Sequence, residues 1–238
     1  MQKSNIITGA LIAGGLALAG FFPGYYFYKT NFDMRTVKVK GLAEKDVKAD
    51  LAVWNICFQS ADNVLPVAKS NIENQEKTIN EFLKNAGFSD NEIIVQGLNM
   101  QDAYADSYRD RNSIPARYTL NQTLTLRTNK VDLVNTTRPK IGDLVSKGVT
   151  FNAYGNSTSY LFTELNSIKP AMLKEATQNA RQAADEFARN SNSKVGKIKS
   201  ANQGVFSILP REEIPDQSER EQITKKVRVV STVEYYLD

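Results

Sequence analysis

The chain has 238 residues, 41% of them hydrophobic and 24% charged, which is the composition of an ordinary globular protein with a real core. Its net charge is only +4, and the lysines and arginines are spread along the sequence, which excludes the basic stripe that a nucleic-acid backbone requires. The sequence contains no histidine and a single cysteine, so Ser-His-Asp and Cys-His catalysis are excluded as well.

The first feature in chain order is an apolar run from Ile6 to Tyr28, which contains no charged residue. At about 1.5 Å per residue the run would make a helix of roughly 34 Å, enough to cross a hydrocarbon core of about 30 Å. Lys3 precedes it, and aromatic residues gather at its end from Tyr25 to Tyr28. This pattern favours a single-pass inner-membrane anchor over residues 1–28, with the rest of the chain in the periplasm.

A cleaved signal peptide is the alternative for the same segment. Ala17-Leu18-Ala19 has the small-x-small form of a signal-peptidase site, and Ile6 to Ala19 has the length of a signal-peptide core. Cleavage near Ala19 would leave a soluble periplasmic protein. The apolar residues that continue to Tyr28 favour the uncleaved anchor.

After a polar linker over residues 29–35, alternating residues predict strands. Thr36 to Lys40 alternates at period two, and Gly41 is expected to end that strand. A second strand is expected from Val47 to Phe58, and its two largely apolar faces predict that it is covered on both sides, at least in its middle. Further strands are expected at Ile93–Met100, Arg117–Thr128, Val149–Phe162, Lys194–Asn202 and Lys225–Leu237.

Helical spacing of apolar residues predicts three helices in the remainder. They are expected from a cap at Asp62 or Asn63 to Gly87, from Val131 to Lys147, and from a cap at Ser167 to Ala188. Pro139 lies inside the second helix and argues for a late start or a kink. Between the last two strands, Gly204 to Thr224 forms a long charged loop, which is either mobile or an interaction surface.

Several segments together resemble a known family. They are Val37-Lys38-Val39-Lys40-Gly41-Leu42-Ala43-Glu44 with Val47-Lys48-Ala49-Asp50, Leu83-Lys84-Asn85-Ala86-Gly87 before Ile93, Arg117-Tyr118 with Gln122, Leu124 and Leu126, and Glu175-Ala176 to Ala188 before Gly196-Lys197-Ile198. Their order and spacing resemble the SIMPL family, the domain of unknown function 541, over residues 36–238. Many relatives have proline where this chain has Ala49.

The resemblance implies a fold and a cellular setting. It implies an α+β fold of strand-helix-strand units, with a mostly antiparallel sheet packed by about three helices. It also implies export to the periplasm, a part in envelope or oxidative-stress physiology, and homo-oligomers that are in some cases ring-like or channel-like. It supplies no catalytic residues.

The clearest cluster of possible metal ligands is Asp102, Asp106 and Asp110, with Arg109 and Arg111 nearby. A calcium site would need several converging oxygens, but the glycine and terminal glutamate of an EF-hand loop are missing. A solvated hairpin tip is therefore the favoured interpretation, and no metal site is predicted.

Other candidate motifs are incomplete. Gly155 to Ser159 falls one residue short of a nucleophile elbow, and Val149 follows Gly148 where a phosphate loop needs lysine. Ser146 and Lys147 are adjacent on a predicted helix, so their side chains point in different directions. Cys57 lies in an alternating strand and is expected to be a packed thiol, with pairing to another chain as the alternative. Tyrosines suited either to an interface or to the core are Tyr104, Tyr108, Tyr118, Tyr154 and Tyr160.

These observations lead to a functional prediction. The chain is predicted to be no enzyme, to hold no cofactor or metal, and to bind no nucleic acid. It is predicted instead to be a membrane-anchored periplasmic homo-oligomer that acts as a scaffold or channel-like assembly. The alternative is a periplasmic peptide- or ligand-binding module that uses its sheet edges.

Overall fold

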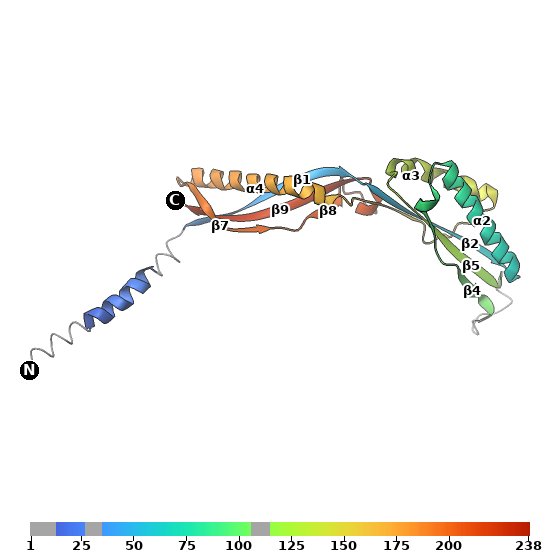
Figure 1. The fold of residues 1–238 in the computed structure, drawn as a ribbon, viewed down its shortest axis with the longest axis horizontal. Coiled ribbons are helices and arrows are strands. Elements are labelled where there is room, and N and C mark those ends of the chain that lie inside the picture. The colour runs from blue at the N-terminus through green and yellow to red at the C-terminus, as the bar shows by residue number, and fades with distance from the viewer. Residues whose placement is uncertain (1–12, 27–34, 106–114) are drawn as a thin grey trace, which may run out of the picture. The chain divides into compact units, whose positions relative to one another are not determined.

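The structure is a computed structural model, and it describes residues 13–26, 35–105 and 115–238. The fold is α+β, with four helices among the described residues, which confirms the predicted α+β class, but the strands form two antiparallel sheets where one was expected (Figure 1). Contacts divide the chain into two compact units. The first unit comprises Met1–Glu44, Pro170–Phe206 and Arg228–Asp238, and the second comprises Lys45–Lys169 and Ser207–Val227.

The N-terminal apolar run is only partly described, as a helix over residues 13–26. Among the helices of the described ranges, none has both the length and the apolarity needed to cross a membrane. The predicted span from Ile6 to Tyr28 extends beyond this helix at both ends, and those ends lie outside the described residues, as does the linker before Arg35. The membrane anchor therefore stays a prediction.

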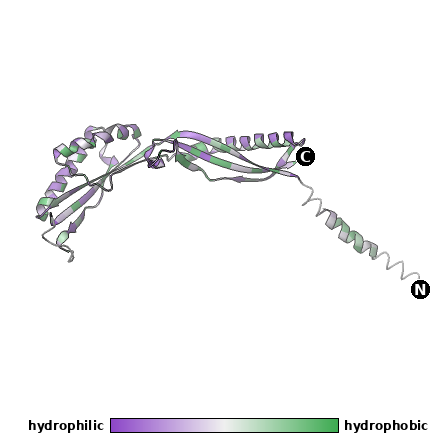
Figure 2. Ribbon diagram, turned by 180° about the vertical axis from the view of Figure 1, so that it is seen from behind, coloured by the Kyte–Doolittle hydropathy of each residue, from purple (hydrophilic) through white to green (hydrophobic). Residues whose placement is uncertain are grey.

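The first unit is a helix packed on one face of an antiparallel sheet. The sheet has the order β1-β9-β7, formed by β1 Thr36–Lys48, β9 Thr224–Leu237 and β7 Val195–Gln203. A further strand that pairs with β9 is β8 Ser207–Pro210, whose residues are counted with the second unit. The helix is α4, Leu165–Asn190, which runs along the sheet (Figure 1). Hydrophobic and hydrophilic residues alternate along the long strands (Figure 2), and in β9 every second residue from Lys225 to Tyr235 is buried. The core consists of Val39, Ala180, Ala184, Val233 and Tyr235.

Gly41 does not end the first strand, so that prediction is wrong. β1 continues through Gly41 to Lys48 because the glycine serves the packing of α4. A Cβ at Gly41 would lie 1.9 Å from the carbonyl oxygen of Ala176 and 2.4 Å from the backbone nitrogen of Ala180. Only glycine allows the helix to approach the strand this closely, which is the common positional use of glycine within a strand.

The second unit contains a five-stranded sheet. Its strands are β2 Leu51–Asp62, β3 Ile93–Val95, β4 Asn99–Asp102, β5 Tyr118–Thr128 and β6 Ser157–Leu161. The order is β3-β5-β2-β6, with β4 also on β5, and every pair is antiparallel. The pair β2 and β5 is the longest, in a register that sets Ile56 opposite Leu124.

Two helices cover one face of this sheet, α2 Leu65–Asn85 and α3 Val131–Thr137 (Figure 1). Short 3-10 helices occur at Asp90–Glu92, Ala103–Ala105 and Glu219–Glu221, and a longer one at Arg138–Lys147. The covered face buries Trp54, Ile56 and Phe58 against α2. On the opposite face Val53, Asn55 and Cys57 are only half-buried, so the prediction that β2 is covered on both sides is wrong.

The predicted helices agree with the structure at some ends and not at others. Gly87 follows α2 with a φ of 102°, the left-handed conformation expected of a residue after a helix end. The predicted second helix is α3 followed by a 3-10 helix, η4 Arg138–Lys147, and the change comes just before Pro139, which has no N–H to donate. α4 begins at Leu165 rather than after a Ser167 cap, and the Oγ of Ser167 donates to the carbonyl oxygen of Glu164 at 2.7 Å.

Two predicted strands are shorter or interrupted. The segment expected at Ile93–Met100 is divided into β3 and β4, and the segment expected at Val149–Phe162 contains only β6. In the second case Asn156 closes a turn before β6, since its side-chain Nδ2 donates to the carbonyl oxygen of Asn152 at 2.5 Å. Such side-chain to backbone bonds compete with strand pairing.

Candidate functional site

The uncovered face of the five-stranded sheet is mostly polar over three strands, with Val53 and the exposed Arg127 opposite each other at one end of the β2–β5 pair. We call it the polar face, and it comprises Asn55, Cys57 and Gln59 of β2, Thr119, Asn121, Thr123 and Thr125 of β5, and Ser157 and Ser159 of β6. These residues share a face because side chains alternate along a strand and the strand register aligns them. All are amide, hydroxyl or thiol side chains.

Hydrogen bonds join this face across the strands. The amide of Gln96 donates to the Oγ1 of Thr125 at 2.8 Å, and that hydroxyl donates to the Oδ1 of Asn55 at 2.8 Å. The Nδ2 of Asn55 then donates to the Oγ of Ser157 at 3.2 Å. The row runs transversely over β5, β2 and β6, so its polar groups are largely satisfied before any partner arrives.

The thiol of Cys57 belongs to the same face. Its Sγ lies 3.3 Å from the Oγ1 of Thr123, and its backbone N–H donates to the Oδ1 of Asn156 at 2.8 Å. A Cβ at Gly155, whose φ is 94°, would lie 2.9 Å from the Sγ. The turn before β6 therefore packs against the thiol and leaves it half-buried.

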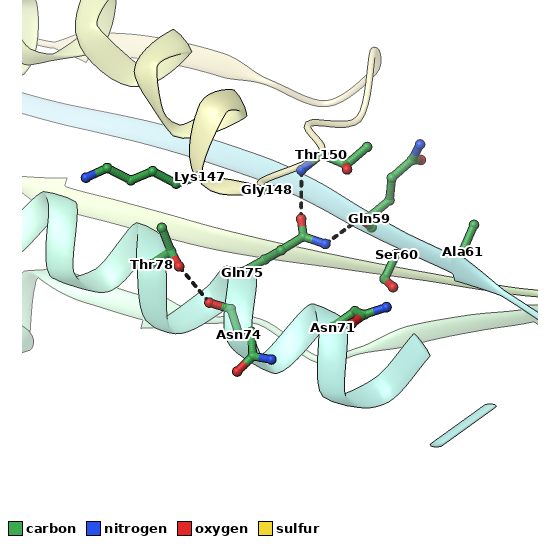
Figure 3. A pocket seen from close by; sticks show the side chains of 10 residues that line it. All are labelled: Gln59, Ser60, Ala61, Asn71, Asn74, Gln75, Thr78, Lys147, Gly148 and Thr150. Carbon is green, nitrogen blue, oxygen red and sulfur yellow. Dashed lines mark hydrogen bonds between the residues drawn. The ribbon is translucent and has the colours of Figure 1, made fainter. Parts of the chain in front are cut away.

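A polar pocket of about 380 Å³ lies between β2, α2 and the segment after η4 (Figure 3). Gln59, Ser60, Ala61, Asn71, Asn74, Gln75, Thr78, Lys147, Gly148 and Thr150 line it. Gln75 is only 7% exposed, and both ends of its amide are used. Its Nε2 donates to the carbonyl oxygen of Gln59 at 3.0 Å, and its Oε1 accepts from the N–H of Thr150 at 2.8 Å. Gln75 thus ties α2 to two backbone segments.

This amide pocket can form hydrogen bonds but has no pair of groups for proton transfer. Its lining holds amides, hydroxyls and one lysine, with no carboxylate. Lys147 extends away from the Gln75 amide, whereas Ser60, which is 5% exposed, points from β2 towards α2 (Figure 3). Sequence reasoning missed the pocket, although Gln75 gave a signal as a polar residue between Ile72 and Ile79 on the apolar stripe of α2.

Asp102, the one described member of the aspartate cluster, is part of an ion pair. Its carboxylate accepts from the Nε and Nη2 of Arg117 at 3.1 and 3.0 Å, and from the N–H of Tyr104 at 2.9 Å. These bonds, chiefly those from Arg117, hold the pKa of Asp102 below its usual value. The guanidinium of Arg117 also stacks on Tyr104 and Tyr118, with 4.9 and 4.7 Å to the ring centroids.

Asp106, Tyr108, Arg109, Asp110 and Arg111 lie outside the described residues. Within the ranges that are described, no three histidine, cysteine or acidic side chains gather closely enough to hold a metal ion. The role of Asp102 is therefore to anchor Arg117 at the start of β5.

The remaining sequence candidates are placed as follows. Ser157 accepts the Asn55 bond within the sheet, Ser146 and Lys147 lie on η4, and Gly148 ends η4 with a φ of 87°. Tyr154 is 86% exposed, whereas Tyr160 is 2% exposed on the covered side of β6. Burial raises the pKa of Tyr160, and the nearby Arg138 offsets only part of that rise.

A second pocket of the same unit lies beside β6, an edge strand of the sheet. It has a volume of about 470 Å³ and is lined by Trp54, Arg138, Ile141, Phe151, Asn156, Ser157, Thr158 and Glu221. Aromatic surface therefore meets one cation, Arg138, and one carboxylate, Glu221. This combination suits a ligand that carries both charges.

Comparisons with known proteins identify the family but no activity. Among solved structures, the regulatory subunit of aspartate kinase from Thermus flavus is 13% identical, with 83% of this chain and 89% of that chain covered and a TM-score of 0.18. An uncharacterized conserved protein from Listeria innocua is also 13% identical, with 78% and 90% covered and a TM-score of 0.16. At these TM-scores neither likeness carries an argument.

No curated protein matches the chain. The model of the SIMPL family, described as "Protein of unknown function (DUF541)", matches residues 37–235. That match spans both units and includes the segments that the sequence pattern singled out. The chain therefore belongs to the SIMPL family.

Proposed function

We propose that this protein is a non-catalytic homo-oligomeric scaffold or channel-like assembly of the bacterial envelope, serving in envelope or oxidative-stress physiology. Residues 6–28 hold it in the inner membrane, and the two units face the periplasm. The polar face of the five-stranded sheet is the observation that carries this proposal. Membership of the SIMPL family supports it, because the family resemblance implies export and self-association.

The polar face suits the close approach of a second copy. Burying a charge is costly unless it is paired, and this face presents amides and hydroxyls that already bond to one another. Two such faces can stack as sheets at about 10 Å, with the charge of Arg127 at the end of the face rather than at its centre. The outer surface of α2 contrasts with it, because Lys69, Glu73, Glu76, Lys77, Glu81 and Lys84 gather there.

Two measurements test this function. Native mass determination of the full chain at micromolar concentration is expected to show a defined multiple of the protomer, and monomers alone would contradict the assembly. Membrane fractionation combined with the mass of the mature protein tests the anchor. An intact N-terminus in the membrane fraction is expected, and a soluble chain that begins after Ala19 would contradict the tether.

The pocket beside β6 favours a second candidate function, binding of a peptide or related ligand at a sheet edge. An extended peptide could pair with β6 while its terminal charges meet Arg138 and Glu221. Hydrogen exchange of the β6 amides, measured with and without a pool of short synthetic peptides, tests this function. Peptides should slow the exchange of these amides in the wild type and in the control Lys140→Glu, but not in Arg138→Glu. Unchanged exchange in the wild type would contradict peptide binding.

A further inference from the structure

The first unit has a groove between α4 and β7 with a volume of about 730 Å³. Leu173, Lys174, Thr177, Gln178, Arg181, Gly196, Lys197, Ile198 and Tyr235 line it. The helix forms one wall, and β7 forms the other as an edge strand of the sheet. The groove is independent of the polar face, which belongs to the second unit.

The floor of the groove is apolar. Tyr235 is 2% exposed beneath α4, and Ile198 is its cross-strand partner on β7. Ile198 is nevertheless 53% exposed. Leu173 of α4 is half-buried on the other side. Leu173 and Ile198 thus offer hydrocarbon surface to solvent on the two sides of the buried Tyr235.

One end of the groove is fixed by Arg181. Its Nη1 and Nη2 donate to the carbonyl oxygens of Gly196 and Val195, each at 3.1 Å. Its Nε lies 3.3 Å from Asp185, and its guanidinium stacks over Tyr235 with 5.2 Å to the ring centroid. Arg181 therefore ties α4 to β7, and its own charge is paired.

The rim carries two further cations, Lys174 and Lys197, and both are exposed. No carboxylate of the described residues forms an ion pair with either one, and the lining itself contains no acidic side chain. An apolar floor below unpaired ammonium groups is complementary to an amphiphile with an anionic head.

We propose that this groove binds a free fatty acid, with its acyl chain on the exposed parts of Leu173 and Ile198 and its carboxylate at Lys174 and Lys197. The helix wall from Leu173 to Arg181 is about 12 Å long at about 1.5 Å per residue, which fits one medium-length chain. An added β-strand fits less well, since the register of β7 shifts on both sides of Ile198 and such irregularity disfavours edge pairing.

Photolabelling tests the proposal on the full chain in nanodiscs of neutral phosphatidylcholine. A diazirine derivative of decanoic acid is expected to label peptides that contain residues 173–181 and 195–198. Ile198→Asn is expected to lower this labelling about tenfold. The matched control is Val205→Asn, because Val205 is 87% exposed and lies outside the groove. Label confined to residues 6–28, or equal labelling of both variants, would overturn the proposal.

Competition separates the fatty acid from other occupants. Decanoate is expected to displace the label about fourfold better than nonanoate, the factor for one buried methylene. Decanoate is also expected to compete at least tenfold better than decanol. The double variant Lys174→Gln, Lys197→Gln should remove this advantage, and the control variant Lys194→Gln should preserve it. Equal competition by decanol, or stronger competition by an acidic peptide, would overturn the assignment. Because none of these results depends on oligomer size, failure here leaves the proposed assembly intact.

Discussion

The two units pack helices on an antiparallel sheet in opposite ways. In the second unit the core is built from large side chains, including Trp54, Phe58 and Tyr160. In the first unit the buried residues of α4 are four alanines and Met172, and Gly41 lets the helix come close to β1. The comparison shows that one layer architecture can be stabilised either by side-chain volume or by close backbone approach.

The difference predicts opposite sensitivities to mutation. Loss of volume should harm the second unit most, and gain of volume should harm the first unit most. Hydrogen exchange of peptides from each unit reads these effects separately, since a single melting temperature would mix them.

The largest expected effect is that of Phe58→Ala in the second unit. Phe58 is 0% exposed, so truncation leaves a cavity and should cost about 3–5 kcal/mol. Phe187→Ala is the matched control, because Phe187 is 63% exposed on α4 and its loss should change stability by less than about 0.5 kcal/mol. Denaturant unfolding with exchange of the β2 and β5 amides measures both. Similar losses of stability in the two variants would contradict the contrast between the two units.

Glu219→Ala should cost about 3 kcal/mol, because it strands a buried charge. Lys225 is 0% exposed, and its Nζ lies 2.5 Å from the Oε1 of Glu219 and 2.5 Å from the carbonyl oxygen of that residue. Urea unfolding measures the loss, with Glu221→Ala as an exposed control nearby. Adding Lys225→Met to Glu219→Ala should recover stability. No recovery would show that the pair is not the cause.

Gly41→Ala tests the close approach of α4 to β1 in the first unit. It should lower the free energy of unfolding by about 1–3 kcal/mol. The new Cβ would overlap the backbone of Ala176, so α4 would have to move. Gly142→Ala is the control, since nothing lies within 4 Å of a Cβ at that position. Faster exchange of α4 amides in the first variant alone is expected. Unchanged α4 exchange would contradict the backbone-approach account.

The smallest effects concern acid stability. In the second unit burial alone raises the pKa of Glu92, but the hydrogen bonds from Ser89, Thr128 and Lys130 more than offset it, so this pKa lies below its usual value. In the first unit the bond from Lys199, followed by that from Thr36, lowers the pKa of Glu234.

A lowered folded-state pKa stabilises the protein above the ordinary carboxylate value of about 4.3, and this stability is lost as pH falls through the folded value. Glu92→Gln should therefore flatten the acid limb of a stability profile in the second unit. At neutral pH this substitution should lower the free energy of unfolding by about 1 kcal/mol. The control Glu81→Gln should change neither the acid limb nor the stability at neutral pH. An acid limb that is equally steep with and without Glu92 would contradict this assignment.

Sequence patterns predicted the elements whose apolar residues recur at a regular spacing along the chain. The alternation of β9 and the alanine stripe of α4 were both sufficient to place those elements. The role of Gly41 was hidden because its neighbour in space, Ala176, lies far along the sequence. Local propensity also could not show that the Asn156 turn would shorten the strand before β6.

The functional surfaces were visible only in part. The polar residues that alternate along β5 from Thr119 to Thr125 can be read from the sequence, but their row with Asn55 depends on the strand register. The amide pocket depends on Gln75 meeting two distant backbone segments. The order and spacing of the family segments were enough to predict the SIMPL family.

The polar face is tested most directly by the mass of the full chain and of two threonine variants. Thr123→Lys places a charge at the centre of that face, and Thr136→Lys places one on the exposed surface of α3. Sedimentation velocity at micromolar concentration in one detergent should show oligomers of the wild type and of Thr136→Lys, and monomers of Thr123→Lys. A monomeric wild type, or unchanged oligomers of Thr123→Lys, would contradict assembly through the polar face.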